Sequence, residues 1–222
     1  MDIIEVLAKE LKIKPSQARA AVEVIDDGNT IPFIARYRKE ATGSLNDEVL
    51  RNLFERLNYL RNLEEKKTQV LSAIEEQGKL TPQLREQILG AQTLVLVEDL
   101  YRPYRPKRRT RATVAREKGL EPLADLILLQ NVKRPLEEEA RKYCSQEKEV
   151  EDVAAALAGA SDILAERISD EADYRTRIRE LTVKEGTLVS SAKNPETESV
   201  YEMYYQYSEP VSKAAGHRIL AL

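Results

Sequence analysis

Apolar side chains recur about every 3.6 residues through the first part of the chain, which is the period of an amphipathic α-helix. Residues 3–11 carry this pattern and predict a first helix. Lys14-Pro15-Ser16 opens a second helix, because proline fits a first turn, and Asp27-Gly28 ends it. The pair is similar to a helix-turn-helix element, although such hairpins serve more often as packing units than as DNA readers.

A much longer helix is predicted from Asn46, whose side chain suits an N-cap, to the stop signal at Gly78. Its apolar positions keep helical spacing: Val49, Leu50, Leu53, Phe54, Leu57, Leu60, Leu63, Val70, Leu71 and Ile74. A helix of roughly thirty residues is far above the average of about eleven, so we expect it to act as a spine. Thr81-Pro82 then predicts a short helix to about Gly90.

Most of the chain after Gly90 is also typical of helices. The apolar run 94–100 fits either a buried helix turn or a strand. Further helical patterns cover residues 113–118, 123–130, 136–144 and 150–186. The last of these holds a candidate break near Gly159 or Asp170.

The helical pattern of apolar residues ends at Gly186. Residues 188–192 and then Asn194-Pro195 are interpreted as a loop. Tyr201, Tyr204 and Tyr205 stand at i, i+3 and i+4, which places them on one face of a predicted helix. We interpret that face as an inter-helix packing seam rather than a base-stacking platform. Residues 217–222 stop within an apolar pattern and are expected to lead into a downstream domain.

Composition agrees with an all-α fold. The chain has 222 residues, of which 42% are hydrophobic and 33% charged, with eight glycines and no tryptophan. Ala, Leu, Glu, Lys and Arg dominate, and these are strong helix formers. We therefore predict a multi-helical module with three parts: helix-turn-helix-like helices and a loop (1–45), a helical scaffold (46–210) and a lead-in (211–222).

Several function classes are disfavoured by the residues. The sequence shows no apolar run long enough for a membrane span and no basic, apolar leader after Met1, so we expect a cytoplasmic protein. Cys144 and His217 are the only soft ligands, so no metal site or cofactor is predicted. No phosphate-binding glycine loop and no metalloprotease pair occur, and neighbouring acids such as Glu98-Asp99 point apart on a helix. We expect no catalytic residues.

A concentrated basic segment stands out in this mildly acidic chain. Residues 101–118 carry eight basic side chains and one acidic, against 14 basic and 17 acidic over 1–100 and 13 basic and 20 acidic over 119–222. Pro103 and Pro106 disfavour helix before them, so 101–106 is predicted to be an extended surface strap. Guanidinium groups on such a strap suit phosphate oxygens.

The candidate phosphate contacts in this segment are Arg102, Arg105, Lys107, Arg108, Arg109 and Arg111, with Tyr101 and Tyr104 as candidate stacking rings. An alternative interpretation is that these arginines form ion pairs with the acidic helices on either side. Both interpretations can hold together.

A second, smaller cluster of cations is formed by Arg36, Arg38 and Lys39. Ile31, Phe33, Ile34 and Ala35 beside it are expected to be buried. The cluster is a weaker candidate for phosphate contacts, because cations at a helix end also interact favourably with the helix dipole without any ligand.

Four blocks of sequence closely resemble the N-terminal region of the Tex family of bacterial transcription accessory proteins. They span residues 26–43, 57–61, 98–111 and 205–210, the last followed by His217-Arg218, and the similarity covers essentially the whole chain. Arg102 stands where the family usually has leucine, and Gln206 where it usually has aspartate. The resemblance implies a helical module with a helix-turn-helix-like start and a long central helix.

In whole proteins of that family, this module precedes an RNase H-like domain, helix-hairpin-helix motifs and an OB-fold RNA-binding domain. We therefore expect a non-catalytic module that scaffolds downstream domains and adds phosphate-backbone contacts to RNA or DNA. The alternative is a protein-docking module for the transcription machinery with no direct nucleic-acid contact. An exposed apolar face on the helix over 49–74 would favour that alternative.

Overall fold

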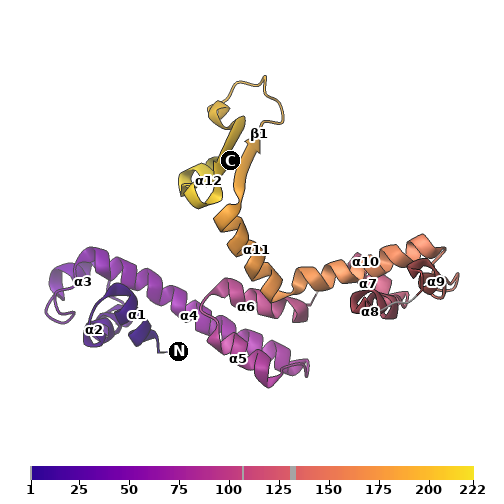
Figure 1. Ribbon diagram of the computed structural model, residues 1–222. Helices are drawn as coiled ribbons and strands as arrows, with labels where there is room; N and C mark the ends of the chain where they lie inside the picture. The colour runs from indigo at the N-terminus through magenta and orange to yellow at the C-terminus, as the bar shows by residue number, and fades with distance from the viewer. Residues whose placement is uncertain (1, 107, 131–133) are drawn as a thin grey trace. The chain divides into compact units, whose positions relative to one another are not determined.

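The protein is built almost entirely of helices. The computed structural model describes residues 2–106, 108–130 and 134–222, and these contain twelve α-helices and a single two-stranded sheet (Figure 1). The predicted all-α fold class is confirmed. Contacts divide the chain into two compact units, one up to Tyr101 and one from Arg102 onward, each with an apolar core of its own.

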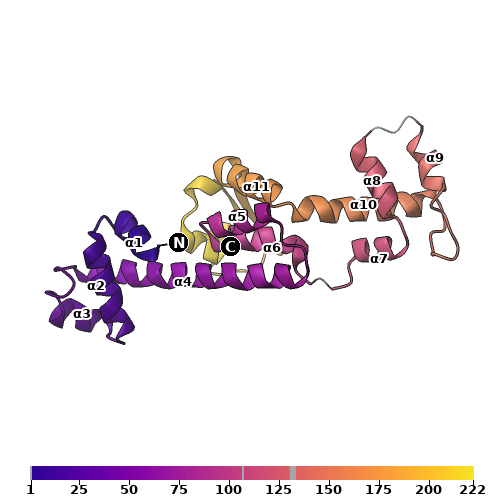
Figure 2. The ribbon, with the colours of Figure 1, turned by 90° about the horizontal axis from the view of Figure 1, so that it is seen from below.

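The first unit is organised along one long helix. Its elements are α1 (Ile3–Leu11), α2 (Pro15–Asp26), α3 (Ile31–Tyr37), α4 (Asp47–Glu76), α5 (Pro82–Gly90) and α6 (Leu94–Tyr101). Figure 2 shows α4 as a straight spine, with α1, α2 and α3 at its N-terminal end and α5 and α6 along its other end. The expected hairpin and spine are both confirmed.

Capping side chains begin the helices where the sequence predicts them. The Asn46 Oδ1 atom accepts a hydrogen bond from the Val49 amide at 2.8 Å, which opens α4. The Thr81 hydroxyl accepts one from the Leu84 amide at 3.2 Å, which opens α5. The helix-turn-helix-like end of the unit is held by a core to which all four of its helices contribute: Leu7, Ala18, Ala21, Ile25, Ile34, Leu50, Leu53 and Leu57.

The apolar residues of α4 are mostly buried within its own unit. Leu50, Leu53, Leu57, Leu60, Leu63, Val70 and Ile74 are almost completely covered. The run 94–100 is helical, which settles the choice between helix and strand. Lys67 of α4 is also buried, and its ammonium group donates to the Glu64 carboxylate at 2.8 Å and the Leu89 carbonyl at 2.9 Å.

The second unit begins with three short helices packed on a longer one. After the single turn η1 (Arg102–Tyr104) come α7 (Arg111–Glu117), α8 (Glu121–Leu129), α9 (Leu136–Arg141) and α10 (Val153–Asp170). Helices α7, α8 and α9 contact α10 (Figure 1) around a core of alanines and branched aliphatic residues: Ala112, Ala115, Leu120, Leu123, Ala156, Ala160 and Ile163.

The predicted break in the last long helical pattern lies at its second candidate position. Helix α10 ends at Asp170 and α11 (Ala172–Glu185) follows. Gly159 instead lies within α10, where a Cβ atom would overlap the Cδ1 methyl of Leu120. Glycine at this position serves close packing rather than a break in the helix.

Two expectations for the C-terminal part were wrong. Residues 187–191 form β1 (Thr187–Ser191), which pairs antiparallel with β2 (Gln206–Pro210), instead of a loop. The tyrosines lie on no common helix, because a single turn, η2 (Glu202–Tyr204), leads directly into β2. In both cases pairing between strands distant in sequence decides the conformation, and local propensity does not show it.

The tyrosines instead close the hairpin. The rings of Tyr204 and Tyr207 meet edge to face with centroids 5.3 Å apart. The Tyr205 hydroxyl hydrogen-bonds to the Thr197 carbonyl and to the Ser199 hydroxyl. The chain continues through η3 (Val211–Lys213) to α12 (Gly216–Ala221).

Candidate nucleic-acid interface

The start of the basic segment is helical rather than extended. Tyr101 is the last residue of α6, and Arg102–Tyr104 form one 3₁₀ turn. The prediction of an extended strap was therefore wrong over these four residues. Pro103 lies within a single turn, where its missing amide hydrogen costs no helical hydrogen bond. Residues 105, 106 and 108–110 lie outside helices and strands, so the segment is irregular only there.

Three of the candidate arginines are held by acidic side chains. The Arg102 Nε atom donates to Asp170 at 2.8 Å, and a terminal nitrogen of Arg109 donates to Glu117 at 2.8 Å. The Arg111 Nε atom lies 3.4 Å from Asp162 of α10. Internal ion pairing, the alternative interpretation of the basic segment, therefore holds for these three.

Two of the candidate arginines are exposed and unpaired. Arg105 and Arg108 make no ion pair or hydrogen bond with any described residue. Lys107 lies outside the described residues. The free positive charge of the segment is therefore centred on the irregular stretch between η1 and α7.

The two candidate stacking rings are only partly accessible. Tyr101 and Tyr104 are both half-buried, one at the end of α6 and the other in η1. The two exposed arginines are thus the members of this segment whose side chains are most available to a phosphate.

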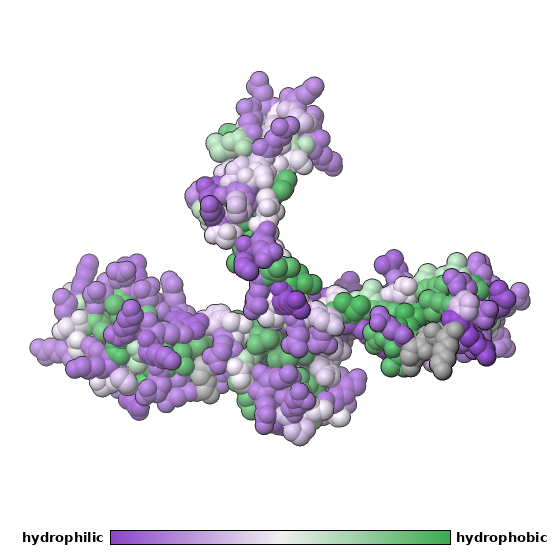
Figure 3. All heavy atoms as spheres, in the orientation of Figure 1, coloured by the Kyte–Doolittle hydropathy of each residue, from purple (hydrophilic) through white to green (hydrophobic). Residues whose placement is uncertain are grey.

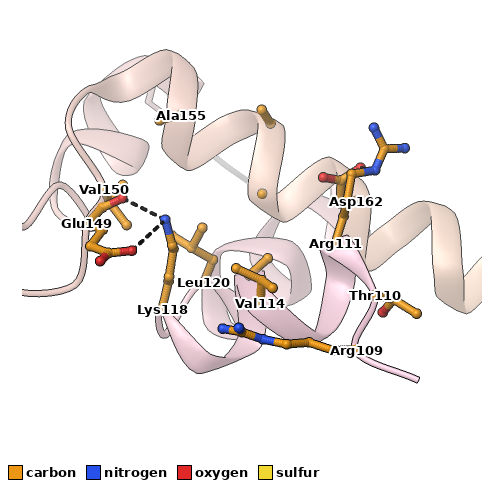
Figure 4. Close-up of a pocket in the computed structure, with 13 residues that line it drawn as sticks. Arg109, Thr110, Arg111, Val114, Lys118, Leu120, Glu149, Val150, Ala155 and Asp162 are labelled. Atoms are coloured by element: carbon orange, nitrogen blue, oxygen red, sulfur yellow. Dashed lines mark hydrogen bonds and ion pairs between the residues drawn. The ribbon is translucent and has the colours of Figure 1, made fainter. Parts of the chain in front are cut away.

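The segment continues into a groove between α7 and α10 (Figure 4). The groove has a volume of about 450 Å³ and an apolar floor that includes Val114, Leu120 and Ala155. Its rim is charged but paired: Lys118 Nζ donates to the Glu149 carbonyl at 2.9 Å, and Arg111 lies beside Asp162. An anion entering this groove would therefore compete with carboxylates already in place.

Behind the groove, acidic and basic side chains tie the helices of the second unit together. Arg116 pairs with Glu166 at 2.8 Å, and Arg167 lies 2.8 Å from Glu121. The carboxylates of Asp125 and Glu121 accept hydrogen bonds from Arg167 and raise the pKa of its guanidinium further. These cations hold α7 and α8 on α10 and are not free for a ligand.

The second cluster, at the end of α3, is different because its cations are free. Arg36, Arg38 and Lys39 are exposed, and none has an ion pair within the described part of the chain. The expectation that Phe33 is buried was wrong, since 39% of it is exposed. In this seven-residue helix Ile34 faces the core, so residues 33 and 37 share an outer face.

This aromatic pair is the feature that sequence reasoning missed. The rings of Phe33 and Tyr37 lie with centroids 5.2 Å apart. The signal present in the sequence is the spacing of four between two aromatic residues around one buried isoleucine.

Two further kinds of feature are absent from the described residues. None of the helices there combines the length and the apolar character that crossing a membrane requires. Nor do the described residues gather three or more His, Cys, Asp or Glu side chains in a geometry suited to a metal ion.

Together these features define the class of the protein: a predominantly helical, two-unit module in which cations at the end of α3 and between η1 and α7 have no ion pair with any residue that the structure describes. The chain belongs to the Tex family. Residues 1–75 match the family model described as Tex-like protein N-terminal domain, and residues 131–222 match Tex central region-like.

Relatives from several organisms match the whole chain. Protein tex of Bordetella pertussis is 50% identical over 222 residues, covering 99% of this chain and 28% of the relative. Transcriptional accessory protein Tex of Neisseria gonorrhoeae is 46% identical over 225 residues, covering 100% of this chain and 29% of the relative. The human S1 RNA-binding domain-containing protein 1 is 28% identical over 231 residues, covering 100% of this chain and 23% of the relative. The chain therefore spans less than a third of the length of these relatives.

Proposed function

We propose that this chain is the non-catalytic N-terminal module of a Tex-like transcription accessory protein in the cytoplasm. It scaffolds the rest of a longer protein and adds phosphate-backbone contacts to a nucleic acid. It needs no cofactor for either task. The observation that carries the nucleic-acid part is the exposure of Arg105 and Arg108, which have no partner among the described residues, in a segment whose other described arginines are paired.

The two free arginines suit phosphate and not base recognition. Both belong to an irregular stretch between η1 and α7, where no regular element sets their register. Guanidinium groups donate two parallel hydrogen bonds to phosphate oxygens, and contacts of this kind carry no sequence information. We therefore propose that the two arginines give auxiliary, sequence-independent binding to the phosphate backbone.

The scaffold part of the proposal is supported by apolar side chains that this chain leaves uncovered. On α11, Tyr174, Ile178, Leu181 and Val183 are each more than half exposed, and Figure 3 shows hydrophobic residues at the surface along this helix. A hollow of about 590 Å³ between α10 and α11 is lined in part by Ile168, Tyr174 and Ile178. Exposed apolar surface of this kind marks an interaction site, and the rest of a longer protein is the occupant we propose.

Salt-dependent binding tests the nucleic-acid part. Fluorescence anisotropy would compare this chain with an Arg105→Ala/Arg108→Ala variant on single-stranded and duplex DNA and RNA. If both arginines contact phosphates of a single strand, the slope of log K against log salt should become shallower by about 0.7 per contact, or roughly 1.4 in all.

A matched control removes the same charge elsewhere. Arg51 pairs with Asp47 at 2.7 Å and Arg85 with Glu75 at 3.0 Å, both on the surface of the first unit. An Arg51→Ala/Arg85→Ala variant should keep the original slope. Equal slopes for all three proteins would show that Arg105 and Arg108 do not contact the nucleic acid. Only the scaffold role would then remain.

Hydrogen–deuterium exchange tests the scaffold part. The amides of α11 should exchange faster in this chain than in a full-length protein, where the rest of the molecule covers them. Ile178→Gln with Leu181→Gln should abolish that difference in the full-length protein, while Arg51→Ala should not. Identical exchange of α11 in the two proteins would contradict the scaffold role.

The second candidate function is docking on the transcription machinery through protein contacts alone. The long helix does not supply the surface for it, because the apolar residues of α4 are mostly buried within the unit. The exposed face of α11 is the observation that favours it. If the chain bound no nucleic acid anywhere in the salt series, protein docking would be favoured over nucleic-acid binding.

A further inference from the structure

We propose that Phe33 and Tyr37 form a stacking platform for an unpaired base of a single-stranded nucleic acid. Arg36, Arg38 and Lys39 bind the backbone phosphates next to that base. This inference rests on the proposed nucleic-acid function, but it adds a second site, in the first unit and on a different element from the basic segment.

The two rings have the exposure that stacking requires. Tyr37 is 71% exposed and Phe33 39%, and their centroids lie 5.2 Å apart with the ring planes inclined by 45°. Phe33 therefore supports one side of the Tyr37 ring and leaves much of that ring open to solvent. A base can stack on such a ring whatever its identity, because every base has a π-face.

The platform is held by a well-anchored backbone. Ile34, between the two rings in sequence, is fully buried, and α3 packs on α4. The loop that follows is closed by hydrogen bonds: the Ser44 amide donates to the Lys39 carbonyl at 2.7 Å, and the Gln17 side chain donates to the Gly43 carbonyl at 2.9 Å. Anchoring of this kind lowers the entropy lost when a ligand binds.

The charged side chains beside the platform are mostly cations without an ion-pair partner among the described residues. Arg36, Arg38 and Lys39 have no acidic partner within the described ranges, and Glu40 is the one acid in the run 36–40. Elsewhere in the first unit Arg56, Arg61 and Lys66 each pair with a carboxylate. Cations that remain free around an exposed ring are the arrangement that single-stranded nucleic-acid binding uses.

A nucleic acid fits this surface better than a protein partner. The neighbouring apolar residues Ile31 and Ala35 are half-buried, so the two rings are the large exposed apolar side chains of α3. A stable protein interface buries about 1,200–2,000 Å² in total and has an apolar centre. Two rings surrounded by cations match a base with its phosphates more closely.

Tryptophan fluorescence gives a direct test, because the chain contains no tryptophan. In a Tyr37→Trp variant, adding oligo(dT) or oligo(U) should quench the emission as a base stacks on the indole. A Tyr174→Trp variant places the reporter at another exposed tyrosine, on α11, and should not be quenched. The two oligonucleotides decide between DNA and RNA.

Affinity measurements supply the second readout. Tyr37→Ala should weaken single-strand binding by roughly tenfold, within the range that removal of one stacking ring causes, whereas Tyr37→Phe should bind like the unaltered chain. Unchanged binding by Tyr37→Ala together with an unquenched Tyr37→Trp would overturn this inference and leave the basic segment in place. Absence of any binding by the unaltered chain would overturn the proposed nucleic-acid function as well.

Discussion

Arg102 and Asp170 form an ion pair that joins the first turn of the second unit to the last residue of α10. The Arg102 Nε atom donates to the Asp170 carboxylate at 2.8 Å. Asp170 is one of the few buried charged residues, with 10% of its side chain exposed. The first arginine of the basic segment is therefore a structural residue, while Arg105, three positions later, has no partner in the part of the chain that the structure describes.

This difference predicts that substitutions at Arg102 and Arg105 affect different properties of the protein. Arg102→Ala should lower the free energy of unfolding of the second unit by about 1.5 kcal/mol, because a buried carboxylate loses a charge-assisted hydrogen bond. Arg105→Ala should leave stability unchanged and weaken nucleic-acid binding. Urea unfolding and fluorescence anisotropy on both variants would measure this, and a stability loss in the Arg105 variant would contradict it.

Close packing at Gly159 leads to a second prediction. Gly159→Ala should destabilise the second unit, since overpacking costs about 1–3 kcal/mol and the better helix propensity of alanine returns about 1 kcal/mol. Leu120, which a new Cβ atom would meet, is 1% exposed and has little room to shift. Thermal unfolding followed by circular dichroism would report the change.

Gly90 provides the matched control for that experiment. It is the last residue of α5, and nothing lies within 4 Å of a Cβ atom placed there. Gly90→Ala should therefore leave the melting temperature unchanged or raise it slightly. Equal melting temperatures for the Gly159 and Gly90 variants would show that the α7–α8 connection does not pack tightly on α10.

The buried ammonium group of Lys67 supports a third prediction. Lys67→Met roughly keeps the side-chain volume, but it leaves the Leu89 carbonyl without this donor and removes one hydrogen bond to Glu64, so we expect a loss of about 1–3 kcal/mol in the free energy of unfolding. Lys66→Met removes a surface pair with Glu98 and should cost less than about 1 kcal/mol. Urea unfolding of the two variants side by side would separate buried from exposed pairing.

Two ion pairs tie the first helices to α4 and make the first unit sensitive to acid. The Arg56 guanidinium, through its hydrogen bond, lowers the pKa of Glu10 below its ordinary value of 4.5. The Arg61 guanidinium in the same way lowers the pKa of Asp26 below 3.8. A carboxylate whose pKa is lower in the folded state contributes stability above its unfolded pKa, and that stability is lost as the pH falls through the folded value.

Unfolding of the first unit should therefore become easier as the pH drops below about 4.5. A Glu10→Gln/Asp26→Asn variant lacks both groups, so its stability should change less between about pH 6 and about pH 3. Urea midpoints measured across that range would show the difference. Parallel pH profiles for the variant and the unaltered chain would mean that these two ion pairs do not contribute to the pH dependence of stability.

Local signals in the sequence determined most of the helices. The caps at Asn46 and Thr81, the prolines at the starts of α2 and α5, and the spacing of leucines along α4 are interactions between residues a few positions apart. Such interactions can be read without knowing the fold. The family resemblance was likewise present in the order of four short blocks.

Tertiary contacts decided the remainder. The β1–β2 pairing joins residues such as Val189 and Ser208, and no local pattern encodes a partner so far along the chain. The division of the basic segment into paired and free arginines depends on where Asp162 and Asp170 of α10 lie after folding. The exposure of Phe33 and Tyr37 depends on which face of α3 meets α4. Composition and periodicity determined that this chain is helical and carries a basic segment, whereas packing alone decided which cations and rings remain open to a ligand.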